Sequence, residues 1–131
     1  MHTVLEIKPS EILINGEVLL PRQALIKRQI VSILAKQYFE DCLKNAEAPK
    51  AFTPKDIAHN LNRTEWDAVY QMNRHIRNIS KEISNRLGKA KDDFKDEVIE
   101  MLTKGSQKTF RLNPKRVRVM ISPFHKTESH P

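Results

Sequence analysis

The first twenty residues alternate between short apolar runs and polar or turn-forming positions. Apolar residues gather at Val4–Ile7, at Ile12–Ile14 and at Val18–Leu20. The dipeptide Asn15-Gly16 separates the second run from the third, and both of its residues tolerate a positive φ. Asn-Gly between apolar runs is a strong sequence signal for a tight hairpin. The pattern therefore predicts a small N-terminal antiparallel sheet.

The period of the apolar positions changes after Pro21. From Arg22 onward these positions recur three or four residues apart, which is typical of one buried stripe on a helix. The pattern predicts a long first helix that ends in the polar stretch 44–50. Cys42, the single cysteine of the chain, continues the stripe, so we expect a small buried thiol. A lone cysteine forms no intramolecular disulfide, which favours a reducing compartment, and we expect a cytoplasmic protein.

Two further helices are predicted between residues 53 and 88. Thr53 suits the N-cap of a short helix, because Pro54 follows at the first helical position and Asp56 lies beside the positive helix end. This helix ends near residues 60–62. A third helix is predicted over 64–87, with Gly88 as its C-terminal stop. Its apolar stripe consists of Val69, Met72, Ile76, Ile79, Ile83 and Leu87.

The chain after the third helix begins with a polar linker at residues 89–97. The segment 98–103 fits a strand, although the apolar residues in and before it also have the spacing of a short helix, so both alternatives stay open. Residues 122–131 are predicted to form a disordered tail. Residues 1–121 then form one domain, which a chain of 131 residues can fold around a modest core.

A basic hairpin is predicted over residues 103–118. Gly105-Ser106 is a turn signal, and apolar and basic residues interleave around it. The strand candidates in this part of the chain are 109–112 and 117–121. The sequence therefore places a charged hairpin after the third helix.

The charge of the chain indicates a polyanionic partner. The formal net charge is +7, and the run from Lys104 to Lys126 has seven Lys or Arg residues and no Asp or Glu. Three glycines cannot build a phosphate-binding or dinucleotide loop, and the five histidines lack cysteine partners and paired short spacing. No apolar run approaches the roughly 18 residues that a membrane span needs. We therefore expect no enzyme, no metal or cofactor, and no membrane partner.

The two helices predicted at 53–62 and 64–87 suggest a helix-turn-helix, whose second helix enters the major groove of DNA. Projected about Ile76, the side opposite the apolar stripe carries Gln71, Arg74, Asn78, Lys81 and Asn85. A solvated helix face has the same composition, and Lys or Arg on a strand also protects a sheet edge. The predicted DNA contacts are Gln71, Arg74, His75 and Asn78 near bases, Thr53, Lys55, Arg63 and Lys81 at phosphates, and Lys104, Lys108 and Arg111 at the backbone or minor groove.

Three segments are similar to parts of a known family. These are the strand–Gly–strand segment Ile12–Leu20, the spacing of Met72, Ile76 and Ile79, and Thr109-Phe-Arg-Leu112, where the family has Gly-Tyr-Arg-Leu. From Leu5 to about Pro114 the chain resembles the effector domain of OmpR/PhoB-type winged-helix response regulators. The resemblance implies an α+β winged helix-turn-helix with a small N-terminal antiparallel sheet, three helices and a C-terminal β-hairpin wing. It also implies sequence-preferring binding of duplex DNA, often by two protomers on repeated half-sites.

The sequence as a whole predicts a double-stranded DNA-binding protein, a transcriptional or plasmid/phage-type regulator that can act as a homodimer. The alternative is a winged-helix protein-interaction or dimerisation module, whose basic hairpin meets an acidic protein partner. Apolar residues exposed on the outer face of the first helix would favour the alternative, whereas their burial favours DNA binding. The small number of aromatic residues disfavours a base-stacking platform for RNA or single strands.

Overall fold

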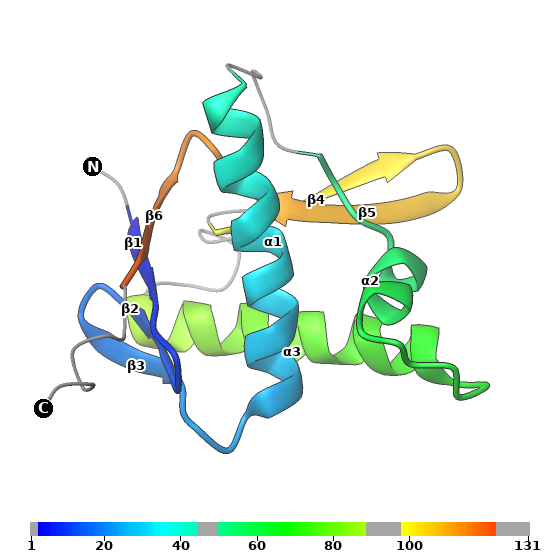
Figure 1. The fold of residues 1–131 in the computed structure, drawn as a ribbon, viewed down its shortest axis with the longest axis horizontal. Coiled ribbons are helices and arrows are strands. Elements are labelled where there is room, and N and C mark those ends of the chain that lie inside the picture. The colour runs from blue at the N-terminus through cyan, green and yellow to red at the C-terminus, as the bar shows by residue number, and fades with distance from the viewer. Residues whose placement is uncertain (1–2, 45–49, 89–97, 123–131) are drawn as a thin grey trace, which may run out of the picture.

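The computed structural model describes residues 3–44, 50–88 and 98–122, which form a mixed α+β fold (Figure 1). The predicted α+β class is therefore confirmed. No helix in these three ranges combines the length and the apolar character needed to cross a lipid bilayer. The elements, in chain order, are β1 (Thr3–Ile7), β2 (Ile12–Ile14), β3 (Glu17–Leu20), α1 (Leu25–Leu43), α2 (Pro54–Asn60), α3 (Ala68–Leu87), β4 (Ile99–Lys104), β5 (Gln107–Leu112) and β6 (Val117–Ile121).

The strands form a four-stranded sheet of order β3-β2-β1-β6 and a separate hairpin of β4 and β5. Asn15 and Gly16 have φ angles of 49° and 87°, and they connect β2 to β3 in the predicted tight turn. Strands β1, β2 and β3 are antiparallel neighbours. Strand β6, however, lies parallel to β1. The predicted antiparallel arrangement of the three N-terminal strands is therefore confirmed, whereas the addition of β6, which was predicted to belong to the C-terminal hairpin, makes the complete sheet mixed.

The basic hairpin lies earlier in the chain than the sequence predicted. Strands β4 and β5 pair around Gly105, whose φ is 65°, so the hairpin spans 99–112 and not 103–118. The strand alternative for 98–103 is confirmed over the helical one. After β5 the chain turns at Asn113, whose carbonyl oxygen accepts hydrogen bonds from the backbone N–H groups of Arg116 and Val117 at 3.2 and 3.0 Å. This turn directs β6 to the four-stranded sheet instead of back to β5.

The hydrophobic core lies where α1 crosses α3, between the four-stranded sheet and the hairpin (Figure 1). Cys42 is exposed, so the prediction of a buried thiol is wrong. The buried face of α1 is centred more than a turn before Cys42, and the last turn of this helix projects past the strands in Figure 1. The largest fully buried side chains are Leu5, Ile12, Ile14, Leu20, Ile30, Val31, Leu34, Ile57, Met72, Ile76, Ile79 and Leu112.

Both edges of the four-stranded sheet receive a hydrogen bond from a helix side chain. The hydroxyl of Tyr38 on α1 donates to the carbonyl oxygen of Val117 in β6 at 3.2 Å. Nε of Arg86 on α3 donates to the carbonyl oxygen of Val18 in β3 at 3.1 Å. These bonds tie the two long helices to the sheet and occupy carbonyl groups that an edge strand otherwise presents for pairing.

Candidate nucleic-acid interface

Helix α2 begins with the predicted N-cap. Oγ1 of Thr53 accepts a hydrogen bond from the backbone N–H of Asp56 at 3.0 Å, and Oδ2 of Asp56 accepts one from the backbone N–H of Thr53 at 3.1 Å. With Pro54 at the first helical position, these bonds make a capping box that fixes the amino end of the helix. Lys55 is exposed on this first turn and forms no ion pair with the described part of the chain.

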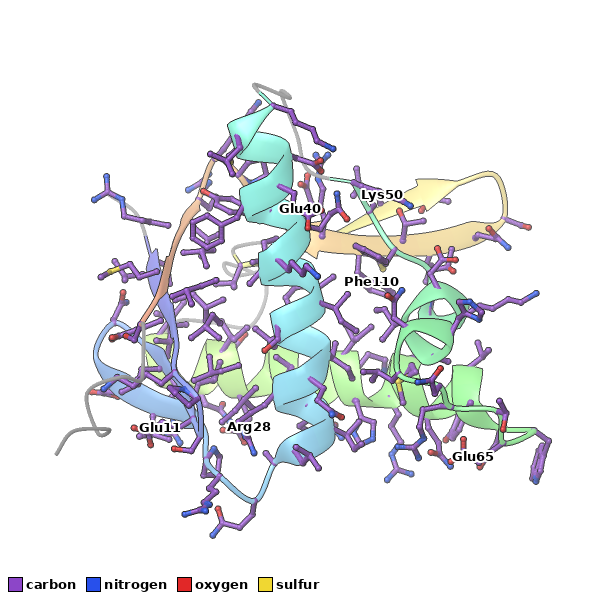
Figure 2. The ribbon with its side chains drawn as sticks, in the orientation of Figure 1. Glu11, Arg28, Glu40, Lys50, Glu65 and Phe110 are labelled. Carbon is purple, nitrogen blue, oxygen red and sulfur yellow. The ribbon has the colours of Figure 1, made fainter. Side chains whose placement is uncertain are left out.

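The hairpin is fastened to the chain immediately before α2. Phe52 and Phe110 exchange two backbone hydrogen bonds, each 2.8 Å long, and both side chains are buried. Phe52 directly precedes the N-cap Thr53. The position of the β4–β5 hairpin is therefore fixed relative to α2. Figure 2 shows Phe110 at the hairpin, between α1 and α2.

The turn between α2 and α3 contains a network of paired side chains. Arg63 forms an ion pair with Glu65 at 2.9 Å and also donates to Oε1 of Gln71 at 3.3 Å. Nε2 of Gln71 in turn donates to Oδ2 of Asp67 at 2.9 Å. The Arg63 guanidinium holds the pKa of Glu65 below its ordinary value, so this carboxylate stays ionised and keeps its partner. Two predicted DNA contacts, Arg63 and Gln71, are thus engaged within the protein.

Helix α3 has one exposed side, which we call the α3 ridge. The opposite side is buried through Met72, Ile76, Ile79 and Ile83. Ridge residues lie three or four positions apart, so they follow one line along the helix, and none of them is a carboxylate. Its three cations form no ion pair or hydrogen bond with the residues that the structure describes. The ridge consists of Tyr70, Arg74, Arg77, Lys81 and Asn85.

Arg77 belongs to the ridge although the sequence analysis did not select it. When Ile76 alone is taken as the centre of the buried side, the predicted exposed face is shifted around the helix toward Gln71 and Asn78. Both of these residues are half-buried at the margin of the ridge. The mean direction of the buried side chains would have placed Arg77 on the ridge. That signal was available in the spacing of the apolar stripe. Arg74 and Lys81 are exposed, as a surface contact requires.

His75 occupies a half-buried position beside the ridge. Its Nδ1 atom is buried and has no hydrogen-bond partner within the described residues. Burial lowers the pKa of this imidazole, and the nearby charges of Lys27, Arg74 and Arg63 lower it further. His75 is therefore neutral at pH 7, and its position makes it a weaker candidate for a base contact than its neighbour Arg74.

The hairpin has fewer unpaired cations than its sequence indicated. Nε of Arg111 lies 2.9 Å from Oε1 of Glu100, its direct neighbour on β4, and both side chains are half-buried. Lys108 is exposed near the tip and has no ion pair in the described part of the chain. The backbone of Lys104 ends β4, but its side chain lies outside the described atoms.

The acid-free run of seven cations is divided between separate parts of the fold. Lys104, Lys108 and Arg111 belong to the hairpin, whereas Arg118 lies on β6 in the four-stranded sheet. Lys115 and Arg116 lie in the turn between these parts, and Lys126 is outside the described residues. The described cations of the run are therefore spread over separate elements of the fold. Local charge on the α3 ridge and at the hairpin tip has to be judged separately.

The hairpin tip, α2 and the amino end of α3 lie at the same end of the long axis of the molecule (Figure 1). Within the described ranges, no three His, Cys, Asp or Glu side chains come together in a way that could hold a metal ion. Comparison of the chain with protein-family models, curated proteins and solved structures finds no significant match. The arrangement of the side chains is thus the basis for any functional assignment.

Proposed function

We propose that this chain is a winged helix-turn-helix protein of the OmpR/PhoB type that binds double-stranded DNA and regulates transcription, or acts as a plasmid or phage regulator. In this proposal α2 and α3 are the helix-turn-helix, and the β4–β5 hairpin is the wing. Helix α3 enters the major groove, and Lys108 at the hairpin tip meets the backbone or the minor groove. Two protomers on repeated half-sites remain part of the proposal.

The observation that carries this proposal is the α3 ridge. Three exposed cations without acidic neighbours on the same line repel each other, and an anionic partner would relieve that repulsion. Arg74 and Arg77 each present several N–H donors, which suit the edge of guanine in the major groove. The exposed Lys55 on the first turn of α2 adds a cation at a position suited to phosphate.

The protein-interaction alternative receives less support from α1. The middle of this helix buries Ile30, Val31 and Leu34, and its exposed large apolar residues are Leu25 and Leu43 near its two ends. An interaction surface along α1 would need a contiguous apolar patch between those ends. The burial pattern therefore favours nucleic acid as the partner.

A fluorescence anisotropy titration with a labelled random duplex at several salt concentrations tests the proposal. If about five phosphates are neutralised, a plot of log K against log salt should have a slope between about −4 and −5. A slope near zero, or no binding at low salt, would overturn the proposal. Binding of an acidic protein segment without binding of duplex would favour the alternative module.

Single substitutions then test the assigned roles. Arg77→Ala should weaken duplex binding about tenfold and reduce the steepness of the salt slope by about one. Arg74→Ala should also relax sequence preference, measured by selection of bound duplexes from a random pool, whereas Lys108→Ala should weaken all duplexes alike. Lys36→Ala removes the same charge from an exposed position on α1 and serves as the control. Equal losses for Arg77→Ala and Lys36→Ala would show that the α3 ridge is not the contact surface.

A further inference from the structure

The most exposed large apolar side chain among the described residues belongs to Trp66, which is 96% exposed. Trp66 lies in the turn before α3 and is the only tryptophan of the chain. Tryptophan is highly buried on average, because its indole ring has a large apolar surface. Its indole N–H is also a hydrogen-bond donor, so the residue suits a partner surface that is apolar in one part and polar in another.

A second exposed aromatic residue continues from Trp66 along α3. Tyr70 follows four residues later, is 62% exposed and is the first member of the α3 ridge. The next members are Arg74 and Arg77. Tyr70 thus lies at the amino end of a line of cations, and Trp66 lies in the turn that leads into it, next to the surface proposed to meet DNA.

The acidic neighbours of Trp66 are already engaged with other side chains. Glu65 forms its ion pair with Arg63, and Asp67 accepts a hydrogen bond from Gln71. These contacts offset part of the negative charge in the turn. An anionic backbone beside the aromatic rings therefore meets less repulsion than the sequence Glu65-Trp66-Asp67 suggests.

The length of the ridge shows which part of a duplex the rings would meet. Tyr70 and Lys81 are eleven residues apart, which is about 16 Å along an α-helix. The major groove of B-DNA is about 12 Å wide. If Arg74 and Arg77 lie over the groove, Lys81 reaches the phosphates on one side, and Tyr70 and Trp66 reach the backbone on the other side.

We propose that Trp66 and Tyr70 contact the deoxyribose–phosphate backbone of the duplex bound by α3, an inference that rests on the proposed function. The rings pack on the apolar face of deoxyribose, while the indole N–H and the phenol O–H donate to phosphate oxygens. Both contacts are uncharged and independent of base sequence. They add affinity for any duplex without adding to the number of released counterions.

The single tryptophan allows the contact to be measured directly. Quenching of Trp66 fluorescence by acrylamide, a neutral quencher, is followed while the anisotropy of a labelled duplex reports binding in the same samples. Free protein should be quenched strongly, because the indole is open to solvent. Protection of Trp66 that follows the anisotropy change supports the inference. Duplex binding with unchanged quenching overturns it and leaves the proposed function intact, whereas the absence of duplex binding overturns both.

Substitutions provide the second measurement. Trp66→Ala should lower the affinity for random and for selected duplexes by the same factor, about tenfold. The slope of log K against log salt should not change. Trp66→Phe should recover part of the lost affinity. Leu43→Ala is the control, because Leu43 is 84% exposed at the far end of α1. Wild-type affinity for Trp66→Ala would overturn the inference. So would protection of Trp66 that rises with protein concentration in the absence of DNA, since a second copy of the chain would then cover the rings.

Discussion

Arg63 shows that contacts within the protein can engage a side chain whose position in the sequence suits a DNA contact. It lies in the turn between α2 and α3, where an arginine of the proposed helix-turn-helix could reach a phosphate, but Glu65 and Gln71 accept hydrogen bonds from its Nε and Nη2 atoms. Arg63 is half-buried, and Glu65 is exposed, so the pair adds little to stability. The larger effect of these contacts is on the availability of Arg63, because fewer of its N–H donors remain for an anion.

Glu65→Gln should therefore raise the affinity for duplex DNA. The substitution releases Arg63 and removes a carboxylate beside the proposed contact surface, so we expect affinity to rise about threefold to fivefold and the salt slope to steepen by about one. Anisotropy titrations at several salt concentrations measure both quantities. The matched control is Glu40→Gln, which changes the charge by the same amount near the carboxyl end of α1 (Figure 2). If both variants bind alike, the effect is one of net charge and not of Arg63.

At the scale of elements, α2 depends on a local sequence signal, its N-terminal capping box. The helix has seven residues, too few to be stable by propensity alone, and its capping box satisfies donors at its amino end. Packing of Ile57 and Ala58 against the core supplies the rest. Because Phe52 binds the hairpin just before the cap, α2 also connects the proposed wing to the proposed recognition helix.

Loss of the cap should be measurable as a loss of stability. Thr53→Ala removes the side-chain acceptor for the backbone N–H of Asp56 and should lower the free energy of unfolding by about 1 kcal/mol. Thr53→Ser keeps the hydroxyl and should retain most of the wild-type value. Urea denaturation followed by circular dichroism measures the difference. Equal stability of the alanine variant and the wild type would contradict a structural role for the cap.

At the scale of the whole molecule, the parallel pairing of β1 with β6 brings together strands from the two ends of the described chain. The Tyr38 hydroxyl adds a link from α1 to β6, and burial raises the pKa of this phenol, so the group stays protonated as a donor. The pairing also removes Arg118 from the proposed DNA-binding surface. Stability and the proposed DNA binding would thus depend on different parts of the basic C-terminal run.

Tyr38→Phe should lower stability without changing the affinity for duplex DNA. Removal of the hydroxyl loses the hydrogen bond to Val117 and should lower the free energy of unfolding by about 1 kcal/mol, with unchanged duplex affinity. Tyr70→Phe is the control for stability, since its exposed hydroxyl has no hydrogen bond within the described residues. Denaturation midpoints and anisotropy titrations provide the two measurements. A larger loss of stability for Tyr70→Phe than for Tyr38→Phe would contradict this assignment.

The sequence by itself determined the features that depend on near neighbours in the chain. Asn15-Gly16 specifies a turn because both positions need a positive φ, Thr53 specifies a helix start, and Gly88 specifies a helix end through its φ of 70°. The three helices and the first three strands were predictable for this reason. Asn113-Pro114 was a further turn signal that the prediction of a hairpin over 103–118 did not use, and the chain does turn at Asn113.

Only the tertiary structure decided which surfaces these elements share. Val117–Ile121 alternates in a way that suits either β5 or β1, and the packing of the whole core selects β1. The engagement of Arg63 and Arg111 depends on carboxylates whose positions follow from the turn and the strand register. Local propensity acts over a few residues, whereas strand partners, ion pairs and exposed faces follow from how the whole chain buries its apolar surface.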